Sequence, residues 1–296
     1  MKKWIQAMRL RTLPLAASCI LAGAAAAKSD GYENSMILLL TLCTTFLLQI
    51  LSNFANDYGD YSHGVDNENR VGPTRAIQSG AISKNQMKRA LIITTLLTLV
   101  SGISLLWFVF APSAQFTSAL IMFALGIGAI AAAIKYTVGN NPYGYRGLGD
   151  LFVFLFFGPV GVLGTCYLLS ATLESQNILL AITTGFYSAA VLNLNNLRDH
   201  VNDAASGKQT LVVKMGFRAG KVYQTILIVI GSLSMCLWIA LNGHSAFAYL
   251  PILASLAQCG LLFSVWKTEE PAMLDPMLKK VAILSLLSSL LLILTV

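Results

Sequence analysis

Charged residues are scarce in this chain. Asp, Glu, Lys and Arg together make up 11% of its 296 residues, whereas 56% of the residues are hydrophobic. Soluble globular domains carry about 25% charged residues. The deficit excludes an ordinary soluble enzyme and places the chain among membrane proteins.

Histidine and cysteine are also few, with three and five residues. No Ser/His/Asp or Cys/His arrangement is evident, which argues against nucleophilic hydrolysis. The cysteines are odd in number and all fall inside apolar segments, so we interpret them as small core residues rather than a disulfide framework or a zinc site. The glycine-rich segment 135–150 lacks the GK[ST] ending of a phosphate-binding loop, and no strand precedes its GLGD sequence.

The chain instead contains long apolar segments. We count nine, at residues 13–27, 35–51, 90–111, 116–134, 151–169, 178–192, 222–241, 246–266 and 281–296. Several fall short of the roughly 20 residues that a spanning helix needs, so their polar flanks are expected to be helical too. We therefore predict an all-α polytopic membrane protein with one transmembrane domain over residues 1–296. A cleaved signal peptide is the alternative interpretation of the first segment, but no soluble exported domain follows it.

The basic residues separate cleanly between the two sides of these segments. With the amino terminus inside, 19 of the 20 Lys and Arg residues are cytoplasmic and only Lys28 lies outside. Because cytoplasmic loops retain positive charge, we expect a cytoplasmic amino terminus. The net charge of +7 then follows from topology and anionic lipid, and a nucleic-acid partner is not needed.

Two polar runs interrupt the apolar chain, one at residues 53–80 and one at 193–210. In the first run Asn53, Asn56, Asp57 and Asp60 share one face if the preceding helix continues. In the second, three residues follow at intervals of four: Asn195, Asp199 and Asp203. Carboxylates stacked on one face repel unless a cation lies between them. We therefore predict two facing half-sites for a hard metal ion on the cytoplasmic side.

Basic residues accompany both runs. Arg70 and Arg75 follow the first acids, Lys208 follows the second, and Lys135, Tyr136 and Arg146 come from a glycine-rich loop on the same side. Oxygen ligands suit Mg²⁺, whose shell substrate phosphates can complete, and the basic side chains can pair the outer phosphate oxygens. The fitting substrate is an amphiphile with a diphosphate head, used either for phosphoryl transfer or for ionisation of an allylic diphosphate in a dry, aromatic-lined cavity.

Three further features of the sequence can be explained without a role in the site. Residues 4–15 form a basic amphipathic segment, in which Arg11 either anchors the chain at the lipid interface or reaches a substrate pocket. The position of Lys135 at the end of a span is explained equally well by the tendency of basic residues to lie on the cytoplasmic side of the membrane. The segment TEEPAMLDP, before the last apolar segment, is expected to be a solvated connector.

The two polar runs resemble a known family. NDYGD with a trailing GVD, then RVGPTR, and NNLRDHVNDAASGKQTL resemble the two aspartate motifs of the intramembrane aromatic prenyltransferases, the UbiA-type superfamily. WIQAMRLRTLPL, YTVGNNPYGYRGLGDLFVFLFFG and GKQTLVVKMG resemble more narrowly its 1,4-dihydroxy-2-naphthoate polyprenyltransferases, which act in menaquinone synthesis. The similarity runs from Trp4 to about Gly216; beyond it only the number of spans agrees.

The resemblance implies a nine-helix bundle around a central cavity in which both aspartate motifs bind Mg²⁺ and diphosphate. The usual pattern has a further Asp at the position of Gly64, and here Asp66 comes two residues later. The implied metal ligands are Asn56, Asp57, Asp60, Asp66, Asp199 and Asp203. The implied catalytic residues are Lys135, Tyr136 and Asp60. The implied substrate-binding residues are Arg11, Asn53, Arg75, Arg146, Asn195 and Lys208.

The implied reaction joins a polyprenyl chain from an all-trans polyprenyl diphosphate to 1,4-dihydroxy-2-naphthoate as carbon dioxide leaves. One alternative is a prenyltransferase for another aromatic acceptor, such as 4-hydroxybenzoate, which keeps its carboxylate. Another is a secondary transporter with inverted repeats. The position of the acids at one membrane face, and not at span centres, argues against a transporter.

Overall fold

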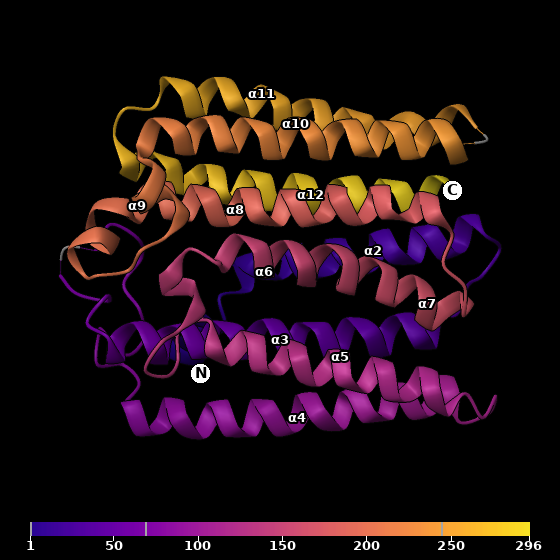
Figure 1. Cartoon of the computed structure of the whole chain (residues 1–296), viewed down its shortest axis with the longest axis horizontal. Helices are drawn as coiled ribbons and strands as arrows, with labels where there is room; N and C mark the ends of the chain where they lie inside the picture. Colours follow the sequence, from indigo (N-terminus) through magenta and orange to yellow (C-terminus); the bar gives the residue numbers. More distant parts are fainter. Residues whose placement is uncertain (1, 69, 244) are drawn as a thin grey trace.

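The computed structural model describes residues 2–68, 70–243 and 245–296, and these residues form helices and connecting loops without a strand. Within them, nine helical segments are long and apolar enough to cross a membrane. The prediction of an all-α polytopic membrane protein with nine spans is confirmed. Figure 1 shows these helices running roughly parallel to the longest axis of the molecule.

The helices follow the predicted order. The first span comprises α1 (Lys2–Met8), the 3-10 turn η1 (Leu10–Thr12) and α2 (Leu13–Ser29). The next three are α3 (Ser35–Ser62), α4 (Lys84–Phe110) and α5 (Phe116–Lys135). The fifth comprises α6 (Gly149–Leu155), the π-helix η3 (Phe156–Leu163) and α7 (Gly164–Ser170). The remaining α-helices are α8 (Ile178–Ala205), a short α9 (Leu211–Met215), α10 (Phe217–Asn242), α11 (Leu250–Lys267) and α12 (Asp275–Thr295). The other 3-10 turns are η2 (Tyr143–Arg146), η4 (Ser175–Asn177), η5 (Ala246–Tyr249) and η6 (Pro271–Leu274).

The polar flanks are helical, as their spacing predicts. Helix α3 begins where the Asn34 side chain accepts hydrogen bonds from the N–H groups of Met36 and Ile37, and it continues through the first acids to Ser62. Helix α8 likewise continues to Ala205. Asp57 and Asp60, and Asp199 and Asp203, therefore lie on helical faces.

Helix α8 occupies the middle of the bundle, where it packs against α2, α6, α10 and α12. The loop between α3 and α4 lies at the same end of the bundle as α9, on the left in Figure 1. The two polar runs thus meet at one end of the molecule.

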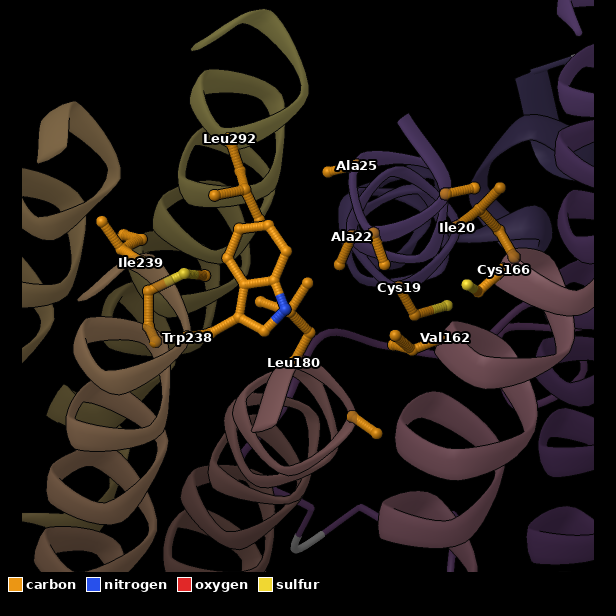
Figure 2. Close-up of a cluster of buried hydrophobic side chains, with 14 of the residues drawn as sticks. Cys19, Ile20, Ala22, Ala25, Val162, Cys166, Leu180, Trp238, Ile239 and Leu292 are labelled. Carbon is orange, nitrogen blue, oxygen red and sulfur yellow. The ribbon is translucent and has the colours of Figure 1, made fainter. Parts of the chain in front are cut away.

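Small residues allow close packing in the bundle interior. Figure 2 shows the indole of Trp238, on α10, between Leu292 and Leu180, with Ala22 and Ala25 of α2 facing it. The indole N–H of this buried residue donates to Asn177 Oδ1 at 3.1 Å. The mainly apolar contact between these four helices thus includes a hydrogen bond that satisfies the buried indole N–H.

Glycines in the fifth span allow close helix packing at two positions. A Cβ added at Gly158 would lie 2.5 Å from the Ala181 carbonyl oxygen, and one at Gly161 would lie 3.0 Å from Cys19 Sγ. At Gly164 the nearest contact is 3.6 Å, which leaves room for a methyl group. Pro159 lies inside the π-helix, where its missing N–H breaks the regular hydrogen-bond ladder.

All five cysteines are free, so the exclusion of a disulfide framework is confirmed. Cys19 and Cys166 are buried, as predicted for core residues. Cys43 is exposed, so its interpretation as a core residue was wrong, and Cys236 and Cys259 are partly buried.

Substitution of Gly23 tests the close packing of α2. A Cβ there would lie 2.4 Å from the Val162 carbonyl oxygen, so Gly23→Ala is expected to cost about 1–3 kcal/mol through overpacking. The matched control is Gly126→Ala, since nothing lies within 4 Å of a Cβ at that position. Thermal unfolding of the purified protein in detergent should show a lower melting temperature for Gly23→Ala alone; equal melting temperatures would contradict this packing.

Candidate functional site

The two polar runs are held together directly. The loop after α3 reaches the end of α8, where Asn202 Nδ2 donates to the Val65 carbonyl at 3.0 Å. A second connection comes from the loop after α5, whose Tyr145 carbonyl accepts from the Gln209 N–H at 3.0 Å. Three connecting segments therefore enclose the carboxylates at one end of the bundle.

Arg75 lies at the centre of the first run. Its guanidinium contacts Asp57 at 2.9 Å, Asp60 at 3.2 Å and Asp66 at 3.2 Å. Arg9, from the segment between α1 and η1, forms a second ion pair with Asp57. All three carboxylates are buried, so each depends on these cations for charge compensation.

Two cations bridge the runs. Arg70 lies 3.2 Å from Asp66 and 3.7 Å from Asp199. Lys208 lies 3.8 Å from both Asp60 and Asp203. The sequence predicted two facing half-sites for a metal ion, and in this structure the protein's own cations lie between them.

The ion pairs continue into the last helix. Arg198 contacts Asp199 with two nitrogens, at 2.8 and 2.6 Å, and also contacts Asp275 at the start of α12. Asp275 in turn lies 3.7 Å from Arg11. The expectation that the connector before the last span is merely solvated was therefore wrong for Asp275, because this residue begins α12 and its carboxylate is directed to Arg198.

The charges of this network balance. We call it the ion-pair network; it contains the six acids Asp57, Asp60, Asp66, Asp199, Asp203 and Asp275 and the six bases Arg9, Arg11, Arg70, Arg75, Arg198 and Lys208. Addition of a cation or an anion alone would upset this balance. Addition of both together would disturb it less, because their opposite charges largely cancel.

Two groups of the network outside the spans have shifted pKa values. Burial, and then the Asp60 carboxylate, raise the pKa of Asp66 to about 7, although Arg70 acts in the opposite direction. Burial lowers the pKa of Lys208, but Asp60, Asp203 and Asp199 outweigh it and raise the pKa above its ordinary value. Lys208 therefore keeps its positive charge, whereas an additional positive charge near Asp66 would favour its ionised form.

A pocket of about 490 Å³ opens beside the network. Its polar end is lined by Asn56, Asp60, Arg75, Asn195 and Lys208. One wall carries four aromatic residues, in which Tyr136 meets Tyr143 edge-on, Tyr143 stacks on Phe152 at 4.1 Å and Phe152 stacks on Phe156. Most of the remaining lining is aliphatic and comes from α2, α3, α4 and α5. The pocket is therefore charged at one end and apolar along its length.

The structure brings most of the predicted site residues together. Eight line the pocket: Arg11, Asn53, Asn56, Asp60, Arg75, Tyr136, Asn195 and Lys208. Four are buried in the ion-pair network beside it: Asp57, Asp66, Asp199 and Asp203. Asn53 has an additional structural contact, since its amide donates to the Met8 carbonyl at 2.8 Å and to the Thr12 hydroxyl at 2.9 Å.

Lys135 and Arg146 lie elsewhere. Both are exposed and line neither the pocket nor the ion-pair network. Lys135 ends α5, and the contact recorded at Arg146 is made by its carbonyl, which accepts from Lys214 Nζ at 2.6 Å. The roles assigned to these two residues from the sequence stay predictions.

The sequence interpretation missed four participants: Arg9, Arg198, Asp275 and Tyr145. The Tyr145 hydroxyl donates to Asp60 Oδ1 at 2.7 Å. Arg198 lies inside the second polar run, between Asn195 and Asp199, and this position was the available signal. Arg9 and Asp275 gave none, because their contacts depend on how distant helices pack.

The donor set fits Mg²⁺ in chemical type. Carboxylate and amide oxygens are the ligands that Mg²⁺ prefers, and both oxygens of Asp66 and Oδ2 of Asp203 are buried without a hydrogen bond. Within the described residues, however, no three His, Cys, Asp or Glu side chains converge closely enough to hold an ion as they stand. A metal ion would have to displace Arg or Lys from these carboxylates.

Removal of Arg75 tests this competition. Arg75→Ala leaves three buried carboxylates short of positive charge, so a loss of about 3–5 kcal/mol in unfolding free energy is expected. Mg²⁺ alone should then raise the melting temperature of this variant more than that of the unsubstituted protein. Arg146→Ala, at an exposed position, is the control. If Mg²⁺ affects all three proteins equally, Arg75 does not compete with a metal ion.

Comparison with known proteins identifies the family. The UbiA prenyltransferase family matches residues 16–287 of the chain. The 1,4-dihydroxy-2-naphthoate octaprenyltransferase of Haemophilus influenzae is 43% identical over 98% of this chain and 94% of its own length. The enzyme of the same name from Escherichia coli is 42% identical over the same shares of the two chains.

A solved structure has the same fold. The UbiA homologue from Archaeoglobus fulgidus bound to GPP and Mg²⁺ superposes with a TM-score of 0.66 over 98% of this chain and 99% of its own, at 16% identity. The family match covers most of the chain, and both sequence relatives are similar over nearly its full length. The chain belongs to the UbiA prenyltransferase family.

Proposed function

We propose that this protein transfers a polyprenyl chain from an all-trans polyprenyl diphosphate to 1,4-dihydroxy-2-naphthoate. Carbon dioxide and diphosphate leave, and the product is demethylmenaquinol, an intermediate of menaquinone biosynthesis. The observation that carries the proposal is the neutral ion-pair network at the polar end of an apolar pocket with an aromatic wall. The names and high coverage of the two bacterial relatives support the choice of substrates.

The proposal includes a membrane arrangement. The protein is a multi-pass protein of the bacterial cytoplasmic membrane, and residues 1–296 form one transmembrane domain. Its amino terminus and the ion-pair network face the cytoplasm, as the distribution of Lys and Arg favours. The pocket is then the central cavity of the bundle, with its charged end at the membrane boundary and its apolar part among the spans.

Mg²⁺ and the donor's diphosphate would bind at the ion-pair network. Asn56, Asp57, Asp60 and Asp66 from the first run and Asp199 and Asp203 from the second would hold the metal. When bound, Mg²⁺ supplies positive charge that stabilises the departing diphosphate. The bases released from these carboxylates, foremost Arg75, Arg70 and Lys208, are free to pair the phosphate oxygens. The prenyl chain extends along the apolar part of the pocket.

The aromatic wall suits the chemistry that follows. The bond between the allylic carbon and the diphosphate oxygen breaks, and its electron pair leaves with the diphosphate. The π-faces of Tyr136, Tyr143 and Phe152 stabilise the positive charge left on the chain, and the apolar lining excludes water that would capture it. Burial, and then the Asp150 carboxylate, raise the pKa of Tyr136, so its hydroxyl stays protonated and does not capture the cation itself.

The acceptor completes the reaction. The naphthoate ring supplies two electrons for the new carbon–carbon bond. The bond from the ring to its carboxylate then breaks, and carbon dioxide departs while the electron pair stays on the ring. The ring regains aromaticity without loss of a proton from carbon. Asp60 and Asn195, at the polar end of the pocket, lie where the acceptor's hydroxyl groups would meet the charged end of the donor.

One assay tests the function. Membranes containing the protein receive Mg²⁺, an all-trans polyprenyl diphosphate and either 1,4-dihydroxy-2-naphthoate or 4-hydroxybenzoate, with products identified by mass and carbon dioxide measured. We expect a prenylated naphthoquinol and one carbon dioxide per turnover with the first acceptor. A prenylated product that retains its carboxylate would favour the alternative acceptor class.

Variants in the same assay test the site. Asp57→Ala and Asp199→Ala remove one carboxylate from each run and should lower turnover by at least about 100-fold while the protein remains folded in detergent. Glu33→Ala, which removes an exposed acid that pairs with Lys28 outside the network, is the control. Retained turnover in either Asp variant would contradict the assignment of both runs to one site.

A further inference from the structure

The first acid of the last helix lies unusually close to the candidate metal ligands. Asp275 is separated from Asp199 by a single side chain, that of Arg198, which contacts both. Arg198 is completely buried, with 0% of its side chain exposed, whereas 35% of the Asp275 side chain is exposed. The guanidinium therefore has no solvent to compensate its charge and depends on these two carboxylates.

The contact between Arg198 and Asp199 is not favoured by the helix itself. Adjacent residues on an α-helix point in different directions, so a two-nitrogen contact between them requires the arginine to bend around the helix surface. Two nitrogens of Arg198 nevertheless donate hydrogen bonds to Asp199, at 2.8 and 2.6 Å. One of these nitrogens also donates to Asn195 Oδ1 at 2.8 Å. Its remaining terminal nitrogen is directed to Asp275. Two contacts therefore hold the bent conformation of Arg198, one to Asn195 on the same helix and one to Asp275 on α12.

The opposite side of Arg198 is closed by backbone. A Cβ at Gly72, in the loop after α3, would lie 2.6 Å from Arg198 Nη2 and 2.8 Å from Arg70 Nη2. Arg198 is therefore confined between this loop and α12. Asp275 also lies 3.7 Å from Arg11, which lines the pocket.

We propose that Asp275 is a positioning residue: it holds Arg198 in the conformation that presents Asp199 to the metal and diphosphate, and so couples α12 to the site. The proposal rests on the proposed function for the identity of that ligand. When Asp199 turns to a metal ion, Asp275 keeps a carboxylate on the buried Arg198. Without Asp275, Arg198 would have Asp199 as its only carboxylate and would compete with the metal for it.

A purely structural role for Asp275 predicts a different outcome. An acid in the first turn of a helix stabilises that helix by interaction with its dipole. Loss of that effect lowers the melting temperature but leaves the affinity for Mg²⁺ and diphosphate unchanged. The test must therefore measure affinity as well as stability.

The binding experiment uses the full-length protein in detergent. Mg²⁺ is titrated calorimetrically in the presence of inorganic diphosphate into the unsubstituted protein, Asp275→Asn, Asp275→Glu and the control Glu270→Gln. Glu270 is an exposed acid of the same connector and forms no ion pair within the described part of the chain. The KM for the polyprenyl diphosphate and kcat are measured in parallel.

Asp275→Asn is expected to weaken the apparent Mg²⁺ affinity about 10- to 100-fold, the usual effect of removing a residue that supports a metal ligand, and to raise KM more than it lowers kcat. Asp275→Glu keeps the negative charge, so its apparent Mg²⁺ affinity should fall by less than roughly tenfold. Glu270→Gln should bind like the unsubstituted protein. The proposal would be overturned if Asp275→Asn bound Mg²⁺ as tightly as Glu270→Gln does. It would also be overturned if Glu270→Gln lost as much Mg²⁺ affinity as Asp275→Asn.

A second measurement needs no metal. Melting temperatures of ligand-free Asp275→Asn, Asp199→Asn and the double variant form a cycle, and coupling through Arg198 predicts that the two losses do not add. Additive losses would overturn the proposal. If the unsubstituted protein fails to bind Mg²⁺ with diphosphate, the proposed function fails, and this cycle still decides whether Asp275 acts through Arg198.

Discussion

The structure depends on the charge balance of six carboxylates that the bundle largely buries at one end. A buried carboxylate without a partner is far more costly than an exposed one, so the fold needs a cation for each. The cations come from four separate parts of the chain: Arg9 and Arg11 before α2, Arg70 and Arg75 from the loop after α3, Arg198 from α8 and Lys208 beyond it. These ion pairs thereby fix the segments that enclose the site.

The same balance explains how one site can suit both a metal ion and a diphosphate. Mg²⁺ alone would have to displace Arg75 or Lys208 and leave them unpaired. A diphosphate alone would have to approach the carboxylates of Asp60 and Asp203. Under the proposed function, the two ligands bound together would exchange partners with the network: the carboxylates would turn to the metal and the bases to the phosphates. The apolar pocket and its aromatic wall would then receive the rest of the substrate.

The sequence predicted the fold and the two halves of the site for identifiable physical reasons. Apolar segments of spanning length determine the helices, and the spacing of Asp57 and Asp60, or of Asp199 and Asp203, determines a helical face. It did not predict that Arg198 reaches Asp275, because this contact joins residues 77 positions apart and depends on the packing of α12 against α8. For Lys135 and Arg146, topology alone placed the residues on the correct side of the bundle, but it carries no information on where their side chains point.

The most direct test of the charge-exchange account is a comparison of three additions to the ligand-free protein: Mg²⁺ alone, inorganic diphosphate alone, and both together. Thermal unfolding reports each binding event, since a ligand that binds only the folded state raises the melting temperature. The account predicts a small shift for each ligand alone and a shift for the pair that exceeds their sum. Mg²⁺ that binds as tightly without diphosphate as with it would contradict the account.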